Sequence, residues 1–355
     1  MEKKQPAYLT LYETLREEIR GGSRPAGSRL PSRRTLARDS GLSVITVEHS
    51  YELLCQEGYA EPRSRSGYYV IYQREDGFAQ PPAAAFSRPS PSEASDSPDH
   101  FPFSVLARTM RRVLSEYGET LLNKSPNPGC LELREAIRRY LARNRNICVD
   151  ARQIIIGSGA EYLYGLVVEL LGRERIYAIE SPSYKKIELV YRSRGVVCDG
   201  LALGHDGIQT AALKKTRASV LHITPFRSFP SGVTASASKR QEYLRWAEVP
   251  GRFIVEDDFE SEFSLLRKPE ETVFARAGNR NVIYMNTFSR TVSPSVRVGY
   301  MVLPEPLAEE YERRLGFYSC TVPAFEQYVL AELLDGGDFE RHINRIRRAR
   351  RKQAL

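Results

Sequence analysis

Residues 286–300, NTFSRTVSPSVRVGY, carry the side chains of this sequence that best suit an anion. Thr287 and Ser289 offer hydroxyl groups, Arg297 offers a guanidinium group, and a glycine near the end leaves room for close approach to the backbone. Guanidinium and hydroxyl groups can bind the oxygens of a phosphate through several hydrogen bonds at once. The segment therefore predicts a loop that holds a phosphate group.

A second anion-binding pattern precedes the apolar segment EYLYGLVVELLG. Ser158, Gly159 and Ala160 open a predicted helix, so backbone N–H groups and the positive end of the helix dipole can face an anion. The alternative is that this Ser-Gly pair is only a helix cap, which is its commonest role. Together with residues 286–300, it makes a phosphate site plausible.

Two further residues suit a planar, charged ring. Asp257 follows the apolar segment FIVE, and a carboxylate buried there would be costly without a partner. A protonated ring nitrogen is one such partner, and an arginine is another. Tyr184 follows a proline turn and could stack on the ring. Taken alone, an aspartate after a strand is more often a turn or cap residue.

The first 72 residues show a different pattern. Their apolar spacing, serine caps and glycine stops predict three helices, at about 9–20, 32–40 and 43–58. A tight turn at Gly41 joins the second helix to the third. Residues 59–72, YAEPRSRSGYYVIY, predict two strands around a basic turn. Two short helices joined by a glycine turn and followed by such a hairpin are typical of a winged helix-turn-helix.

The third helix is amphipathic, so one face packs on the other two helices and the opposite face can enter a major groove of DNA. Hydroxyl groups and helix N-termini suit phosphates, and arginine suits phosphate or guanine. The candidate DNA contacts are Arg34, Ser43, Thr46, His49, Arg63, Arg65 and Gly67. The alternative is a helical protein-binding module with a solvated hairpin.

Residues 80–98, QPPAAAFSRPSPSEASDSP, are rich in Pro, Ser and Ala and have no apolar period. Such a segment buries little surface and predicts an extended linker. We place the DNA-binding domain at residues 1–76, the linker at 77–99 and the larger domain at 100–355. This division gives two parts of ordinary domain size.

The larger domain alternates helical segments with short apolar runs. The runs expected to be strands include IIIG, IYAIES, VYRSRG, VVCDGLAL, SVLHITP, FIVEDD and VIYMNT. This alternation predicts an α/β fold with a mainly parallel sheet. Ligands of such sheets lie beyond the carboxyl ends of the strands, where the loops with the anion-binding patterns begin.

Composition excludes several classes of protein. The 355 residues are 41% hydrophobic and 27% charged, with no apolar run of the roughly 18 residues that span a membrane. Five scattered cysteines without a CxxC pair and five dispersed histidines argue against a disulfide framework or a metal site, and suit the cytoplasm.

The net charge of +8 is local. Residues 341–352 hold seven of the 52 Lys and Arg, and the other 45 nearly balance the 44 Asp and Glu. We interpret this tail as the solvated face of a helix, with Ile343 and Ile346 as its apolar stripe. Global charge therefore does not by itself identify a DNA-binding protein.

The order of three helices and a wing, with the motifs LPSRRTLA, TVEHSYELLCQEGY and GYYV, resembles the GntR-type winged helix. The resemblance covers about the first 72 residues and implies binding to a double-stranded DNA operator. Members usually carry Ser-Arg at the start of the recognition helix, where this sequence has Ser43 and Val44. The missing arginine predicts an unusual operator or weaker binding.

Residues 101–355 resemble fold-type I aminotransferases, most specifically in IVEDDFESEF and TFSRTVSPSVRVGYMVLP. Joined to the winged helix, they resemble the MocR subfamily of GntR regulators. The resemblance implies a homodimer whose large domain senses pyridoxal 5'-phosphate (PLP) or its amino-acid adduct. Carried onto this sequence, the cofactor-binding residues are Ser158, Gly159, Ala160, Tyr184, Asp257, Thr287, Ser289 and Arg297. In this set Tyr184 stacks on the pyridine ring and Asp257 pairs with its nitrogen.

Three departures from the family concern the chemistry, and a fourth concerns the length of the chain. The Schiff-base lysine falls on Arg290, whose permanently protonated guanidinium cannot supply a free amine. The tyrosine that bonds the ring oxygen falls on Phe259, and the usual Ser-His-Gln loop is Phe-Arg-Ser at residues 226–228. The family also has a small C-terminal subdomain that supplies an arginine for a substrate carboxylate, and we expect it to be missing after Leu355.

These departures favour a DNA-binding regulator whose aminotransferase-like domain is catalytically inactive and serves in dimerisation or effector binding. The alternatives are a working PLP-dependent aminotransferase with an accessory DNA-binding domain, and a truncated product that folds poorly. We expect PLP, if it binds, to bind non-covalently. Either Arg290 pairs with Asp257 and fills the site, or PLP or another anionic metabolite binds with Arg290 as an added counter-charge.

Overall fold

The computed structural model describes residues 6–64, 66–73, 100–259, 261–264, 270–278 and 281–353. The chain divides into two compact units, Met1–Glu93 and Ala94–Leu355, and each has a hydrophobic core of its own. Arg65 and the predicted linker at 77–99 lie outside the described residues.

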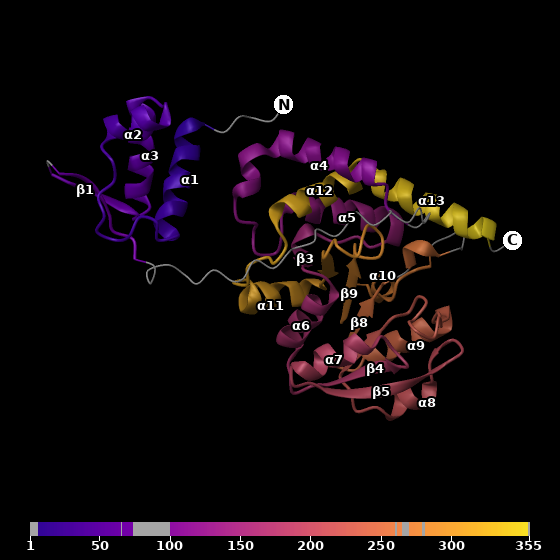
Figure 1. Cartoon of the computed structure of the whole chain (residues 1–355). Coiled ribbons are helices and arrows are strands. Elements are labelled where there is room, and N and C mark those ends of the chain that lie inside the picture. The colour runs from indigo at the N-terminus through magenta and orange to yellow at the C-terminus, as the bar shows by residue number, and fades with distance from the viewer. Residues whose placement is uncertain are drawn as a thin grey trace. The chain divides into compact units, whose positions relative to one another are not determined.

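The first unit contains three helices and a hairpin (Figure 1). Its elements are α1 (Ala7–Arg20), α2 (Arg33–Ser40), α3 (Val44–Gln56), β1 (Ala60–Arg63) and β2 (Gly67–Val70). The side chains of Ser32 and Ser43 cap α2 and α3, and Gly41 ends α2 in the left-handed conformation at φ 68°. The predicted helix-turn-helix and its wing are confirmed.

The core of the first unit is formed by the apolar stripes of its helices. Every third or fourth residue of α1 and α3 points inward, which is the spacing that places side chains on one helix face. The residues buried in this way are Tyr12, Leu15, Ile19, Val47, Tyr51 and Leu54. The opposite face of α3 is left exposed.

An eight-stranded sheet forms the centre of the second unit, in the order β3-β10-β9-β8-β7-β4-β5-β6. The strands are β3 (Ile154–Gly157), β4 (Ile176–Ser181), β5 (Val197–Gly204), β6 (Gly207–Ile208), β7 (Val220–Ile223), β8 (Phe253–Asp257), β9 (Val282–Thr287) and β10 (Gly299–Val302). All run in one direction except β6 and β10. The carboxyl ends of six strands therefore meet at one edge, where β10 begins.

Helices cover both faces of this sheet. In β3, Ile154 and Ile156 enter one hydrophobic core and Ile155 enters the other, so the strand is buried on both sides and reads as a continuous apolar run. One core includes residues of α5, α9, α12 and α13, and the other includes residues of α6, α7 and α11. The predicted α/β fold is confirmed, and Figure 1 shows α4, α5, α12 and α13 gathered along one side of this unit.

The helices of the second unit are α4 (Phe103–Tyr117), α5 (Leu131–Arg145), α6 (Ala160–Leu171), α7 (Lys185–Ser193), α8 (Thr210–Lys215), α9 (Ala237–Ala247), α10 (Val273–Ala277), α11 (Glu305–Leu315), α12 (Ala324–Asp335) and α13 (Asp338–Gln353). Short 3-10 helices are η1 (Gly118–Leu122), η2 (Ala151–Gln153) and η3 (Ser261–Phe263). Within the described ranges, none of the helices has the length and apolar character needed to cross a membrane.

One predicted strand is wrong. VYRSRG, residues 190–195, begins inside α7 and continues into the turn that follows it. Ile187 and Tyr191 are four residues apart and both are buried, so a helix places them on the same face of the sheet. The β-branched and aromatic residues that suggested a strand are the inner stripe of this short helix.

Candidate functional site

The N-terminus of α6 and the start of β10 meet at the carboxyl edge of the sheet. Gly299, the first residue of β10, is paired with Gly157 at the end of β3 and with Thr287 at the end of β9. The two segments that carry the anion-binding patterns, around residue 158 and in residues 286–300, are therefore neighbours. The rule that ligands lie beyond strand ends predicted this meeting.

Gly159 and Arg297 lie at the centre of the surface that the sequence predicts to bind an anion. Gly159 has φ 90° and precedes α6, and a Cβ atom added there would lie 3.0 Å from an Nη atom of Arg297. Glycine thus permits the guanidinium to lie against the helix N-terminus, where N–H groups already favour an anion. Arg297 is half-exposed and lies 3.6 Å from the Glu161 carboxylate, so it remains open to a stronger anionic partner.

The other predicted phosphate ligands hold the backbone of these loops. The Ser289 hydroxyl donates to the Val296 carbonyl at 2.9 Å, and the Thr287 N–H donates to the Asn286 side chain at 2.6 Å. The Ser158 N–H donates to the hydroxyl of Thr321 at 3.1 Å. Thr321 was missed by sequence reasoning, since it lies far along the chain and outside any anion-binding pattern.

Asp257 lies at the end of β8, almost fully buried, inside a polar network. Its Oδ2 atom accepts a hydrogen bond from the Tyr164 hydroxyl and lies 3.7 Å from Nε2 of His222. The other ring nitrogen of His222 is 2.7 Å from the Tyr191 hydroxyl. Burial, followed by the nearby carboxylate, raises the pKa of Tyr164 well above its usual range, so this phenol stays a donor.

Both contacts of Asp257 use one carboxylate oxygen. Among the described residues, Oδ1 has no hydrogen-bond partner, and Nε2 of His222 also has none although it is buried. The Asp257–Arg290 ion pair that we considered is not formed. Arg290 is exposed instead, with its guanidinium carbon 6.0 Å from the centre of the Phe263 ring. One oxygen of Asp257 is therefore available to a protonated ring nitrogen.

Aromatic and acidic groups of neighbouring loops complete the surroundings. Tyr184, which precedes α7, is 42% exposed and lies edge-on to the Phe229 ring at 6.2 Å, so a face is open for stacking. Ser228 of the Phe-Arg-Ser loop donates to buried Glu180, which also accepts from the Thr224 N–H at 3.1 Å. Burial raises the pKa of Glu180 to about 7.

The phenylalanines at the departures from the family lie in different environments. Phe226 is buried, with the guanidinium groups of Arg145 and Arg240 at 5.9 and 5.3 Å from its ring centre. Phe259 is 39% exposed and offers no hydroxyl to a ligand. The ring of Phe226 is therefore packed in the protein, and the side chain of Phe259 has no hydrogen-bond donor.

The residues predicted to contact DNA differ in whether their side chains already have partners within the first unit. The Ser43 hydroxyl accepts from the Thr46 N–H and bonds the Thr46 hydroxyl at 2.8 Å, so both side chains are used in capping α3. His49 is exposed and lies edge-on to Tyr8. Within the described ranges Arg34 has neither a hydrogen-bond partner nor an ion pair, so its exposed guanidinium is available to a phosphate.

The wing is stabilised by its own arginines. Arg63 pairs with Glu61 at 2.8 Å and lies 4.4 Å above the Tyr69 ring. Gly67 has φ 105°, and Arg29 lies against it, 3.4 Å from where a Cβ would be. Exposed Arg29 is a basic residue near the wing that sequence reasoning missed, because it lies in an irregular segment before α2.

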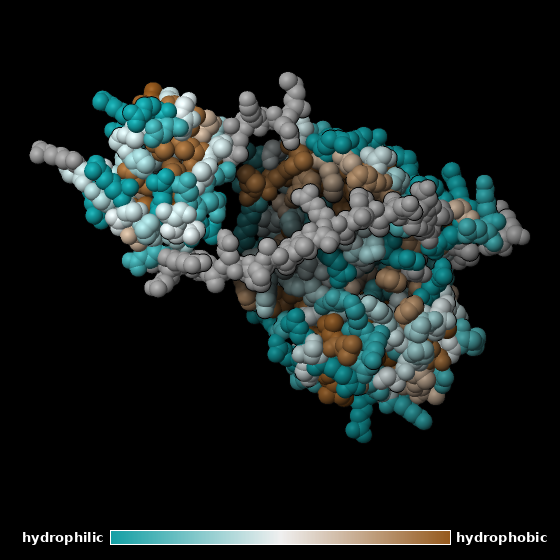
Figure 2. Space-filling view, in the orientation of Figure 1, coloured by the Kyte–Doolittle hydropathy of each residue, from teal (hydrophilic) through white to brown (hydrophobic). Residues whose placement is uncertain are grey.

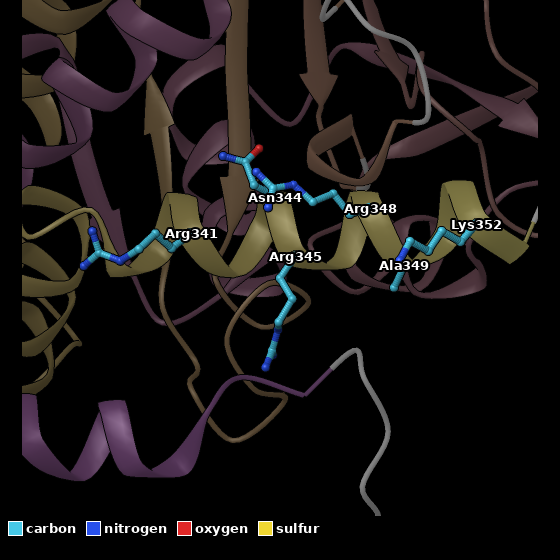
Figure 3. A pocket seen from close by; sticks show the side chains of 6 residues that line it. All are labelled: Arg341, Asn344, Arg345, Arg348, Ala349 and Lys352. Atoms are coloured by element: carbon cyan, nitrogen blue, oxygen red, sulfur yellow. The ribbon is translucent and has the colours of Figure 1, made fainter.

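A hollow of about 560 Å³ lies on the second unit, and all six residues that line it belong to α13 (Figure 3). These are Arg341, Asn344, Arg345, Arg348, Ala349 and Lys352. Ile343 and Ile346 on the opposite face are buried, which confirms the predicted amphipathic helix. Arg341 pairs with Asp338 at 2.7 Å and Arg345 donates to the His100 carbonyl at 2.7 Å. No residue of the strand-end loops lines this hollow.

Comparison with known proteins extends over both units. Residues 7–70 match the family described as "Bacterial regulatory proteins, gntR family", and residues 94–355 match "Aminotransferase class I and II". The chain is 30% identical to the HTH-type transcriptional regulator YdeL of Bacillus subtilis, over 98% of this chain and 77% of YdeL. It is 29% identical to a probable rhizopine catabolism regulatory protein, MocR of Rhizobium meliloti, over 97% of this chain and 74% of that protein.

Solved structures of aminotransferases share the fold of the second unit. LysN, an α-aminoadipate aminotransferase from Thermus thermophilus complexed with N-(5'-phosphopyridoxyl)-L-leucine, superposes with a TM-score of 0.63 and 27% identity, over 72% of this chain and 66% of LysN. An archaeal alanine:glyoxylate aminotransferase superposes with a TM-score of 0.62 and 23% identity, over 68% of this chain and 62% of that enzyme. The chain thus spans about two thirds of the length of these enzymes.

Proposed function

We propose that this chain, which belongs to the MocR-type GntR transcriptional regulators, is a regulator without transaminase activity. In this family a helix-turn-helix domain is fused to a class I and II aminotransferase domain. Its first domain, residues 1–76, binds an operator, and the linker at 77–99 leads to a sensor domain at 100–355. The protein acts in the cytoplasm, where its DNA is.

The observation that carries the loss of activity is the identity of residue 290. PLP supplies an electron sink when it is bound, and covalent attachment to an enzyme requires a neutral amine. Arg290 carries a delocalised, permanent positive charge and cannot become that amine. At residue 259 the family's tyrosine, which bonds the ring oxygen of PLP, is a phenylalanine, so a second hydrogen-bond donor to the cofactor is lost. The loss of both groups supports a sensor that no longer performs the reaction.

The residues of the site still suit non-covalent PLP. Ser158, Gly159 and Ala160 would hold the phosphate together with Arg297, because a half-exposed guanidinium lies against the N-terminus of α6. The N–H groups of Ser158 and Gly159 would exchange their present bonds to Thr321 and Gly157 for the phosphate. The Thr287 hydroxyl would donate to the same group, and the Ser289 hydroxyl would do so by exchanging its bond to the Val296 carbonyl. Tyr184 would stack on the ring through its exposed face.

Asp257 would accept a hydrogen bond from the protonated ring nitrogen through Oδ1, while Tyr164 and His222 remain at Oδ2. Another anionic metabolite with a planar, cationic ring would meet the same groups. Each of these roles concerns binding and orientation, and none requires a proton to move.

A homodimer is part of the proposal, because apolar side chains are exposed on the second unit. They include Phe103, Leu114 and Leu122, which are 78%, 57% and 85% exposed. Figure 2 shows hydrophobic surface near α4. Apolar surface of this kind favours association with another protein surface.

The test combines PLP binding with chemical reduction. Purified protein is titrated with PLP, treated with borohydride and weighed by mass spectrometry. We expect removable PLP in the natural chain and no added mass, whereas Arg290→Lys restores an amine that reduction can trap. Covalent labelling of the natural chain, with exchange of amino and keto acids, would instead establish the alternative, a working aminotransferase with an accessory DNA-binding domain. Footprinting of the DNA flanking the gene, with and without PLP, tests the regulatory role.

A further inference from the structure

The exposed face of α3 begins with two apolar side chains. Val44 is 42% exposed and Ile45 is 67% exposed, whereas Val47, Tyr51 and Leu54 on the inner face are fully buried. An amphipathic surface helix ordinarily presents polar residues at such outer positions. The apolar side chain of Ile45 thus contributes little to the core of the first unit and faces outward on the first turn of the helix.

The groups around Ile45 do not favour a purely apolar partner. Ser43 and Thr46 place hydroxyls and the helix N-terminus beside it. Glu48, one turn further along the same face, is neutralised by an ion pair with Arg33, so its carboxylate is less able to repel phosphates. Exposed Arg34 adds an unpaired positive charge among the described residues. An apolar spot within polar and basic groups matches a DNA major groove better than a hydrophobic interface.

In a helix-turn-helix protein, the N-terminal residues of the second helix of the motif contact base edges in the major groove. The one apolar group that a base presents there is the 5-methyl group of thymine. We propose that Ile45 contacts a thymine methyl group in each half-site of the operator, with Val44 beside it, and that this contact selects thymine at that position. The inference rests on the proposed DNA-binding function and names what its recognition helix reads.

This assignment also gives a meaning to the missing arginine. Arginine reads guanine through two hydrogen bonds to O6 and N7, whereas the aliphatic side chains of valine and isoleucine have no donor and read only shape and methyl contact. With Val44 and Ile45 at the start of α3, the base selected at this position of the operator is thymine, where an arginine would select guanine. The phosphate contacts that give affinity come from other residues, so the change alters specificity more than overall binding.

The experiment uses the full chain and a duplex that it selects from a random-sequence pool. Each thymine of the selected site is replaced singly by deoxyuridine, which removes the methyl group and keeps the hydrogen-bonding groups. At one thymine per half-site we expect about a four-fold loss of affinity, as for exposure of one buried methyl group. Ile45→Ala should bind the thymine duplex more weakly and lose its preference over deoxyuridine. Ile71→Ala, at another exposed apolar residue of this unit, should keep that preference.

Because Ile45 is mostly exposed and alanine favours helices, the variant is expected to melt like the natural chain. The inference is overturned if every deoxyuridine duplex binds the natural chain as well as the thymine duplex. It is also overturned if Ile45→Ala keeps the full thymine preference, or if it changes the oligomeric state without DNA, which would make Ile45 a contact between copies. Failure to select any duplex would overturn the DNA-binding function itself, a result distinct from selection without a methyl preference.

Discussion

Replacing Arg297 by methionine tests whether the N-terminus of α6 binds the phosphate of PLP. The guanidinium lies against Gly159, and its side chain is 51% exposed. A hydrogen bond to a charged group contributes about 1.5–3 kcal/mol, and solvent screening of a half-exposed pair favours the lower end of this range. A loss of about 1.5 kcal/mol corresponds to a Kd that is roughly ten-fold higher.

The assay compares PLP with pyridoxal, which has the same ring and no phosphate. Isothermal titration of Arg297→Met should give a Kd about ten-fold higher for PLP and an unchanged Kd for pyridoxal, because only PLP carries the anion. Glu161→Gln removes the carboxylate 3.6 Å from Arg297 and should tighten PLP binding. Arg192→Met, which breaks an exposed ion pair on α7, serves as the control.

Two results would refute this reasoning. One is an equal effect of Arg297→Met on PLP and pyridoxal, since that would indicate a general change of the site and not a lost phosphate contact. The other is unchanged PLP affinity in both Arg297→Met and Gly159→Ala. The alanine variant strains a backbone with φ 90° and places a Cβ 3.0 Å from the guanidinium, so it should also weaken PLP binding.

Five other variants test the fold and the DNA interface. Arg145→Met should lower the free energy of unfolding in urea by about 3–5 kcal/mol, because it leaves the fully buried carboxylate of Asp258 without its counter-charge at 2.8 Å, with only the Tyr284 hydroxyl donating to it. Arg143→Met breaks an exposed pair and should cost about 0–1 kcal/mol. The pKa of Glu180 is raised from 4.5 to about 7 in the folded protein, so the folded state holds this proton more tightly than the unfolded state does. The resulting stabilisation is fully present below pH 4.5 and is lost as the pH rises through 7. Glu180→Gln removes the titrating group and should make the decline in stability from about pH 5 to pH 7 shallower. Arg34→Ala should weaken operator binding and reduce its salt slope by about one, and Arg65→Ala should act in the same direction.

Each of these predictions has a contrary result. Similar unfolding free energies for Arg143→Met and Arg145→Met would show that the buried pair is compensated elsewhere. Parallel stability curves for the natural chain and Glu180→Gln would exclude this carboxyl as the source of the pH dependence. Unchanged operator affinity in filter binding, in both Arg34→Ala and Arg65→Ala, would remove these residues from the DNA interface.

The first unit could be predicted in detail because its signals are local. Ser32 and Ser43 cap helices by bonding backbone groups three residues away, and Gly41 ends a helix through its own φ angle. The second unit was predictable as an alternating α/β pattern, but residues 190–195 show where such a pattern fails. A short helix with one buried stripe has the same residue types as a strand, and only its packing partner distinguishes the two.

The site was predictable only where neighbouring segments follow from strand direction. The meeting of Gly159 with Arg297 depends on the rule that parallel strands end at one edge. The partners of Asp257 were missed, since Tyr164 and His222 lie within apolar segments of α6 and β7 that suggest core packing. Their contact with the carboxylate arises from the lateral order of strands, and spacing along the chain carries no information about that order.

The position of β10 has a consequence for how the protein is made. This strand closes the anion-binding edge by pairing Gly299 with both Gly157 and Thr287, so that edge is incomplete on the ribosome until the chain has been synthesised past residue 302. The helices and wing of the first unit need only contacts within the first 72 residues, and such a unit folds soon after it leaves the exit tunnel. Each newly synthesised chain therefore has its helix-turn-helix before it completes the edge that we propose binds PLP.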